Sequence, residues 1–198
     1  MRYPTDQKAR TRERILCAAG AAFRRHGYAG ASVDLIMKEA GLTPGGFYAH
    51  FKSKRALFVE AFARGLASAA AQGIPARDHG TGADYVRSFT GAYLSPTHRK
   101  ALVEGCPMPP LLPDVPRAGA AARQTFERAV QSLAGMLGHH HAGPEPDEAL
   151  ALVSLMIGGL SVSRGVADER FADRVLAACR GLIERTLSPR RKAKGDPS

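Results

Sequence analysis

The segment 32–51 places two short helical patterns on either side of a tight turn at Gly41. Ser32 is a good N-cap residue, and the apolar residues after it recur at the spacing of one helical face. After the turn, Thr43 can cap a second helix and Pro44 can open it, because the first helical position needs no N–H donor. Two short helices that meet at a tight turn are therefore expected here.

The remainder of the chain also has helical patterns, with no alternating β-branched runs bounded by turns, so an all-α fold is expected. The first helix should run from Gln7 to His26 and stop at Gly27. A helix capped by Ser53 should follow the segment 32–51. Later helices are expected over 83–94, 118–137, 147–165 and 168–187, with loops at 72–82 and 138–146 and an irregular, proline-rich connector at 105–116.

The two short helices can pack on the first helix through apolar side chains. Phe47 and Phe51 are four residues apart and so share a face of the second short helix. Both can contact Ile15, Phe23 and Ile36, which leaves the opposite face of that helix free. In this helix-turn-helix arrangement the second helix enters the DNA major groove while the first braces it.

Charge divides the chain unevenly. Of the formal net charge of +10, residues 1–58 carry +7, residues 59–184 carry −1 and residues 185–198 carry +4. A basic N-terminal part on a near-neutral body is typical of nucleic-acid binding, whereas a generally basic soluble protein is the alternative. The expected domains are a DNA-binding domain at 1–52, an effector-binding and dimerisation domain at 53–188 and a basic disordered tail at 189–198.

The free face of the helix-turn-helix carries small and polar residues that suit a duplex. Hydroxyl, phenol and imidazole groups can reach phosphates or base edges, and the arginines of the first helix leave a basic face for solvent or phosphate. Gly45 and Gly46 weaken a helix by roughly 1 kcal/mol each relative to Ala, which close approach to DNA would offset. The candidate DNA-binding residues are Ser32, Asp34, Thr43, Pro44, Gly45, Gly46, Tyr48, Ala49, His50, Lys52 and Lys54.

The stretch Gly-Leu-Thr-Pro-Gly-Gly-Phe-Tyr-Ala-His-Phe-Lys-Ser-Lys-Arg-Ala-Leu at 41–57 closely resembles the signature of the TetR/AcrR family of one-component regulators. The resemblance covers about residues 10–60. It implies that Tyr48 and His50 contact the DNA backbone and that Lys54 binds a phosphate. It also implies a homodimer with an all-helical ligand-binding body, which usually represses transcription until a small molecule releases the DNA.

The last two helices are rich in small and apolar residues. By the family resemblance they form a four-helix dimer interface, whereas the alternative is a core within one subunit. A dimer would also place two recognition helices roughly 34–36 Å apart to bind a palindrome. The candidate interface residues are Leu152, Leu155, Met156, Gly159, Leu160, Leu176, Cys179, Leu182 and Ile183.

An apolar effector cavity is expected between the DNA-binding part and the dimer interface. Its candidate residues, for each of which plain core is the alternative, are Phe62, Phe89, Tyr93, Cys106, Met108, Phe126 and Met156. Cys106 follows Gly105 in a pair that resembles one in a branch of the family with suspected thiol chemistry; a buried inert thiol is the alternative. The run His139–His141 lacks the spacing of a metal site, and neither metal nor cofactor is expected.

Other classes of protein fit the sequence less well. The longest apolar stretch, 149–162, has about 14 residues against roughly 20 for a membrane span, so a cytoplasmic protein without membrane contact is expected. Three distant cysteines indicate thiols rather than disulfides. No catalytic constellation or phosphate-binding loop argues for an enzyme. A ligand-independent or activating DNA-binding protein stays open as an alternative to a ligand-released repressor.

Overall fold

The computed structural model describes residues 4–72, 82–140 and 146–187, and these ranges contain helices and no strands. The all-α prediction is confirmed. The helices are α1 (Pro4–Gly30), α2 (Val33–Glu39), the 3₁₀ helix η1 (Pro44–Ala49), α3 (Lys54–Gln72), α4 (Gly82–Tyr93), α5 (Pro96–Lys100), α6 (Met108–Leu111), α7 (Ala120–His140), α8 (Pro146–Gly165) and α9 (Glu169–Leu187).

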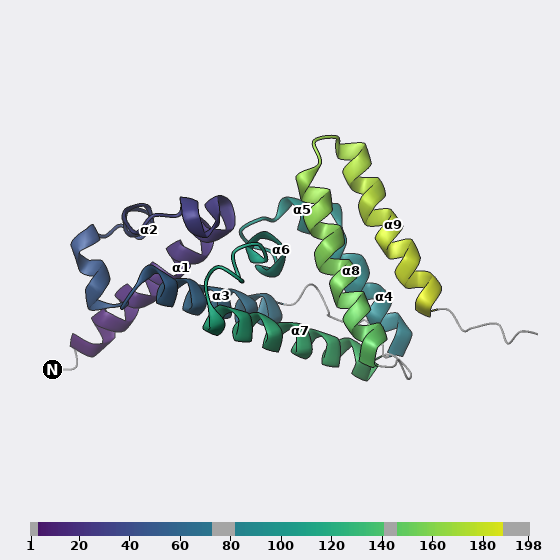
Figure 1. Cartoon of the computed structure of the whole chain (residues 1–198), viewed down its shortest axis with the longest axis horizontal. Coiled ribbons are helices and arrows are strands. Elements are labelled where there is room, and N and C mark those ends of the chain that lie inside the picture. The colour runs from purple at the N-terminus through teal and green to yellow at the C-terminus, as the bar shows by residue number, and fades with distance from the viewer. Residues whose placement is uncertain (1–3, 73–81, 141–145, 188–198) are drawn as a thin grey trace, which may run out of the picture.

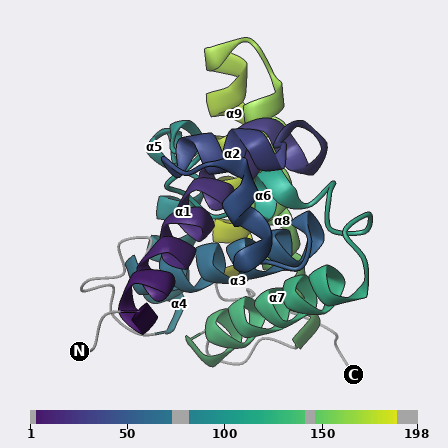
Figure 2. The same ribbon diagram turned by 90° about the vertical axis from the view of Figure 1, so that its left-hand side faces the viewer.

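The helices form two parts that lie side by side (Figure 1). We call α1, α2, η1 and the first half of α3 the headpiece, and the rest of α3 with α4 to α9 the body. Helix α6 lies between the two parts, where it packs on α1 and on α8. Seen from the headpiece end, α7 runs alongside α3, on which it packs (Figure 2). Helix α3 therefore belongs to both parts.

Local signals begin α2 and α3 as predicted, whereas α1 runs from Pro4 to Gly30 rather than from Gln7 to His26. The hydroxyl of Ser32 accepts a hydrogen bond from the N–H of Leu35 at 3.1 Å, and the hydroxyl of Ser53 accepts one from Ala56 at 3.1 Å. Gly41 has φ 66°, in the left-handed region that favours glycine. The helical backbone of α1 is interrupted at Gly27, where φ is 67° and ψ is 174°, and one more turn follows it.

The second helix of the pair differs from the prediction. It is a 3₁₀ helix that ends at Ala49, and the side chain of Thr43 makes no capping hydrogen bond, although Pro44 does open the helix. A short segment with two adjacent glycines has little α-helical propensity, so the tighter form is reasonable. The Thr43 hydroxyl is consequently not used by the helix itself.

The connector between α4 and α7 is more ordered than predicted. Ser95 caps α5 through a hydrogen bond from the N–H of His98 at 3.1 Å, and Pro96 opens this helix, which was not predicted from the sequence. The expectation that 105–116 is irregular is wrong for α6. Its two prolines, Pro109 and Pro110, lie within the first turn, where a missing N–H costs nothing.

An aromatic cluster joins α1 to α3. The ring of Phe58 makes edge-to-face contacts with Phe23, at 5.1 Å between centroids, and with Tyr28, at 5.3 Å. Phe58 also stacks on Phe62 at 6.1 Å. These side chains belong to one continuous hydrophobic core that extends from the headpiece into the body.

Helix α8 is long and apolar enough to cross a membrane by length and composition alone. Eight of its residues are buried, and it packs against α7 and α9 as a central helix of the body. This packing accounts for its apolar composition. The predicted tail at 189–198 and most of the predicted loops at 72–82 and 138–146 lie outside the described residues.

Candidate DNA-binding interface

The two aromatic side chains predicted for the inner face of the helix-turn-helix are buried. Phe47 has no exposed surface and Phe51 is 3% exposed, and their rings stack at 5.9 Å. Both belong to the same buried cluster as Ile15, Phe23 and Ile36. Large aromatic side chains on this face fix η1 on α1 and α2 and turn its other face to solvent.

Tyr48 is the main apolar feature of the outer face. It is 75% exposed, although its ring touches that of Phe47 edge-on at 5.1 Å. An exposed aromatic ring with a hydroxyl is suited to contact a polar partner. Of the other predicted DNA-binding residues, Gly46, His50 and Lys54 are partly buried, and the exposed ones are Ser32, Asp34, Thr43, Pro44, Gly45, Ala49 and Lys52.

In the part of the chain that the structure describes, nothing requires the two glycines of η1. A Cβ atom at Gly45 would have no heavy atom within 4 Å, and one at Gly46 would lie 3.7 Å from Met37, an ordinary contact. Neither glycine has a positive φ. Their helix-weakening effect therefore has no internal explanation, which favours the prediction that another molecule approaches here closely.

Lys54, the first residue of α3, does not point freely into solvent. Its ammonium lies over the ring of Tyr28, 4.7 Å from the centroid. Partial burial lowers the pKa of Lys54, and the carboxylate of Asp114, from the connector before α7, acts in the opposite direction. If Lys54 binds a DNA phosphate, its ammonium does so while it lies over the ring of Tyr28.

The arginines of α1 are used mainly within the chain, which corrects the prediction of a basic outer face. Arg14 donates to the carbonyl of Ala40 at 2.6 Å and so caps the end of α2. Arg25 pairs with Glu39 at 2.9 Å. The remaining partners are Glu60 for Arg12 and the carbonyl of Val103 for Arg24.

Most of the predicted dimer residues lie inside the subunit. Six of them are buried. Gly159 lies so close to Cys179 that a Cβ atom at position 159 would be 2.7 Å from the Cys179 sulfur. Only Leu155, Cys179 and Leu182 keep solvent exposure. The buried six are Leu152, Met156, Gly159, Leu160, Leu176 and Ile183.

A partly different set of residues on α8 and α9, which keeps Leu155 and Leu182 from the prediction, is apolar or small and wholly or partly exposed. These residues recur every three or four positions and flank the contact between Gly159 and Cys179, so they form one surface. We call it the α8–α9 face. It consists of Leu155, Gly158, Val162, Phe171, Val175, Ala178 and Leu182.

The predicted effector residues are packed in the core. All are at most 7% exposed except Phe126, which is partly buried; this fits either a ligand-lined centre or plain core. A cavity of about 250 Å³ lies elsewhere, between α4 and α9. Its lining residues are Arg87, Thr90, Gly91, Arg180, Gly181, Ile183 and Glu184.

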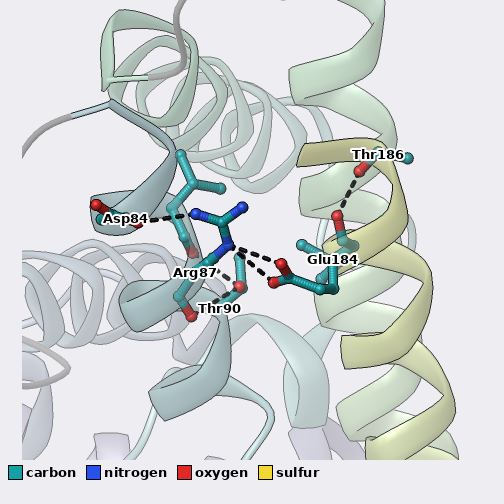
Figure 3. A network of polar contacts seen from close by, with 7 residues as sticks. Asp84, Arg87, Thr90, Glu184 and Thr186 are labelled. Atoms are coloured by element: carbon teal, nitrogen blue, oxygen red, sulfur yellow. Dashed lines mark hydrogen bonds and ion pairs between the residues drawn. The ribbon is translucent and has the colours of Figure 1, made fainter. Parts of the chain in front are cut away.

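Polar contacts bridge the two helices at this cavity (Figure 3). The Nε atom of Arg87 donates to both carboxylate oxygens of Glu184 at 2.8 and 3.0 Å, and its Nη1 donates to Asp84 at 2.8 Å. Gly91 and Gly181 contribute no side chains to the space between the helices. No sequence pattern predicts this cavity, because its two walls are almost a hundred residues apart.

Cys106 is buried beside His98. The carbonyl of Tyr93 accepts a hydrogen bond from Nδ1 of His98 at 2.7 Å, so Nε2 must be the acceptor for the N–H of Cys106 at 3.0 Å. A Cβ atom at Gly105 would lie 2.7 Å from this ring, which explains the glycine before the cysteine. Burial raises the pKa of the Cys106 thiol, against the opposing influence of Tyr93, Arg24 and Arg164.

Comparison with known proteins supports this description. A family model described as bacterial regulatory proteins, tetR family, matches residues 15–61. Over 50 residues the chain is 44% and 40% identical to two HTH-type transcriptional regulators of Bacillus subtilis (strain 168), YdgC and YerO. The match covers 25% of this chain in both cases, and 26% and 17% of those two proteins.

Solved structures resemble nearly the whole chain. The reduced form of NemR from E. coli has a TM-score of 0.75 at 18% identity, over 89% of this chain and 96% of its own. A TetR transcriptional regulator from Chloroflexus aurantiacus J-10-FL has a TM-score of 0.73 at 22% identity, over 93% and 98%. At these identities the likeness concerns the fold.

A helix-turn-helix on an all-helical body is the architecture of a DNA-binding transcriptional regulator. Residues 15–61 match the family model of the bacterial regulatory proteins of the tetR family, and the chain as a whole has the fold of solved TetR regulators. The resemblance noted in the sequence is thereby confirmed.

Proposed function

We propose that the protein is a homodimeric repressor, rather than an enzyme, that binds a palindromic operator in the cytoplasm and leaves it when a small molecule binds the body. The exposure of Tyr48, 75% on a face whose neighbouring aromatics are buried, is the main support. In this proposal Tyr48 and His50 hold phosphates, while Thr43, Gly45 and Gly46 approach the groove. The alternative is a regulator that activates or needs no effector.

DNase footprinting with DNA from around its own gene tests the DNA-binding part of the proposal. Protection of a short palindrome is expected, because two linked recognition helices read two half-sites roughly one helical turn apart. Uniform coverage of the probe would contradict specific binding and favour an architectural role. Transcription from the protected promoter, with and without the protein, then separates a repressor from an activator.

The α8–α9 face supports the dimer, because a contiguous apolar surface on two adjacent helices is typical of a subunit interface. Val162 is 53% and Leu182 44% exposed. The double variant Val162→Asp/Leu182→Asp should be monomeric in sedimentation equilibrium. Leu112→Asp, at a side chain 38% exposed outside this face, is the matched control and should stay dimeric. A dimeric double variant would exclude this face as the interface.

The body contains two candidate binding sites for an effector. The cavity between α4 and α9 has room for a small molecule, whereas the aromatic and methionine side chains of the core would have to move apart. Gly91→Leu should fill the cavity without disturbing the fold, since a Cβ atom there meets no heavy atom within 4 Å. Loss of the response to an inducer in this variant, with operator affinity kept, supports the cavity. An unchanged response supports the core.

Oxidation of Cys106 is a second candidate for the release signal, favoured by the positive charges of Arg24 and Arg164, which act to lower the pKa of the thiol. Burial, which raises the pKa of the thiol, opposes it. Cys106→Ser should abolish release of DNA by hydrogen peroxide while leaving affinity intact. The same oxidant response in wild type and variant would exclude Cys106 as the trigger.

A further inference from the structure

Asp114 is a residue of the body that reaches the headpiece. It lies in the connector between α6 and α7, and its carboxylate accepts a hydrogen bond from the backbone N–H of Tyr28 at 2.8 Å. This N–H follows Gly27, where the helical hydrogen bonding of α1 is interrupted. The carboxylate thus satisfies a donor that the interrupted helix leaves open. A Cβ atom at position 27 would lie 3.3 Å from the same carboxylate.

The carboxylate of Asp114 also acts on Lys54. The Lys54 ammonium lies over the ring of Tyr28, the same residue whose backbone N–H donates to the Asp114 carboxylate, and this carboxylate acts to raise the pKa of Lys54 against the effect of burial. One carboxylate therefore contacts the backbone of Tyr28 while it attracts the cation seated on the Tyr28 ring. Lys54 is at the same time the first residue of α3, next to the helix-turn-helix.

We propose that Asp114 is a positioning residue that couples the body to DNA binding: its carboxylate ties the connector to Tyr28 and competes with DNA phosphate for Lys54. This inference rests on the proposed function. Each phosphate that a cation neutralises releases a counterion and strengthens binding. A carboxylate held beside the cation reduces this gain, and any movement of the connector that withdraws the carboxylate restores it. The position of the connector in the body thereby sets the affinity of the headpiece.

Three variants separate the hydrogen bond between Asp114 and Tyr28 from the competition between Asp114 and DNA phosphate for Lys54. Asp114→Asn keeps an oxygen that can accept from Tyr28 but removes the charge, and Asp114→Ala removes both. Asp147→Asn is the matched control for net charge, because Asp147 is exposed in the first turn of α8, which begins at the end of the body away from the headpiece (Figure 1). Lys54→Met keeps the apolar stem over Tyr28 and removes the cation.

Affinity for a short random duplex is measured by fluorescence anisotropy at several salt concentrations. Asp114→Asn is expected to bind about two- to fivefold more tightly than Asp147→Asn, the range of a weak, partly exposed charge pair. The gain should vanish in the Lys54→Met background. Equal affinities of the two charge variants, or a gain that persists without Lys54, would overturn the competition.

Hydrogen exchange tests the tie independently. The amide of Tyr28 should exchange faster in Asp114→Ala than in wild type, and at the wild-type rate in Asp114→Asn. Unchanged exchange in Asp114→Ala would overturn the tie. If wild-type protein shows no salt-dependent affinity for duplex DNA, the proposed function fails instead. If wild type binds and the Asp114 variants behave as the control, only this inference fails.

Discussion

The helix-turn-helix and the α8–α9 pair each contain two adjacent residues of similar chemistry that face opposite ways. In η1, Phe47 is fully buried while Tyr48 is 75% exposed. In α8, Gly159 is packed closely against Cys179, whereas a Cβ atom added at Gly158 would meet no heavy atom of the described residues within 4 Å. Large side chains that fill the core stabilise the headpiece. In contrast, α8 and α9 pack closely because Gly159 has no side chain between them. In each pair, one residue therefore holds the core together and its neighbour lies on the surface.

The largest effect should come from the aromatic pair. Phe47→Ala should lower the free energy of unfolding by about 3–5 kcal/mol, because it removes a fully buried aromatic ring from the core. Tyr48→Ala should change it by less than about 0.5 kcal/mol and instead weaken binding to operator and random DNA alike. Urea denaturation and anisotropy measure the two quantities. A large loss of stability in Tyr48→Ala would show that its ring belongs to the core.

The glycine pair should give the next largest difference. Gly159→Ala should destabilise the protein by about 1–3 kcal/mol, because its Cβ atom would lie 2.7 Å from the Cys179 sulfur and 3.3 Å from Leu94. Gly158→Ala should be neutral or stabilise by up to about 1 kcal/mol through helix propensity. Thermal unfolding of the two variants compares them directly. Equal stabilities would mean that α9 can move away from α8 at little cost.

A third comparison concerns the two expected caps of the helix-turn-helix. Ser32→Ala should cost about 0.5–2 kcal/mol, because it removes the hydrogen bond from Leu35. Thr43→Ala should change stability by less than about 0.5 kcal/mol, since Thr43 makes no capping bond. Chemical denaturation under identical conditions decides. A Thr43 variant as unstable as the Ser32 variant would indicate a cap that forms in solution.

The smallest effect is a pH dependence at His98. Burial lowers the pKa of His98, and its Nε2 atom must stay unprotonated to accept from Cys106. The native state therefore binds fewer protons than the unfolded chain below about pH 6.5, and stability falls as the pH drops through that value. His98→Asn should flatten stability against pH between about pH 5 and 7. An equally steep curve in the variant would assign the dependence to other groups.

Local signals made the headpiece predictable. Ser32, Gly41, Pro44 and Ser53 act within a few residues of their own position, so their meaning can be read without knowing the fold. The same reasoning would also have found α5, because Ser95 followed by Pro96 repeats the signal of Thr43 and Pro44. Helix α6 was harder, since prolines usually end a helix and are tolerated only in its first turn.

Long-range contacts were not predictable in the same way. The partner of Tyr28 is Asp114, 86 positions along the chain, and no pattern near either residue indicates the other. On α8 and α9 the apolar composition indicated a buried surface but not whether another subunit or the same subunit covers it. Met156 and Leu160 were therefore expected at an interface and lie in the core. The arginines of α1 misled similarly, because their acceptors come from other parts of the chain.

Because Arg87 and Glu184 form an ion pair between α4 and α9, the packing of α9 on α4 should depend on the salt in solution (Figure 3). An ion pair between exposed side chains weakens as ionic strength rises, whereas apolar contacts strengthen in salts such as sulfate that are excluded from protein surfaces. At equal ionic strength, chloride and sulfate should both weaken the ion pair that holds α9, but sulfate should also strengthen its apolar contacts. The oligomeric state and unfolding midpoint of this protein carry meaning only when the salt is stated with them.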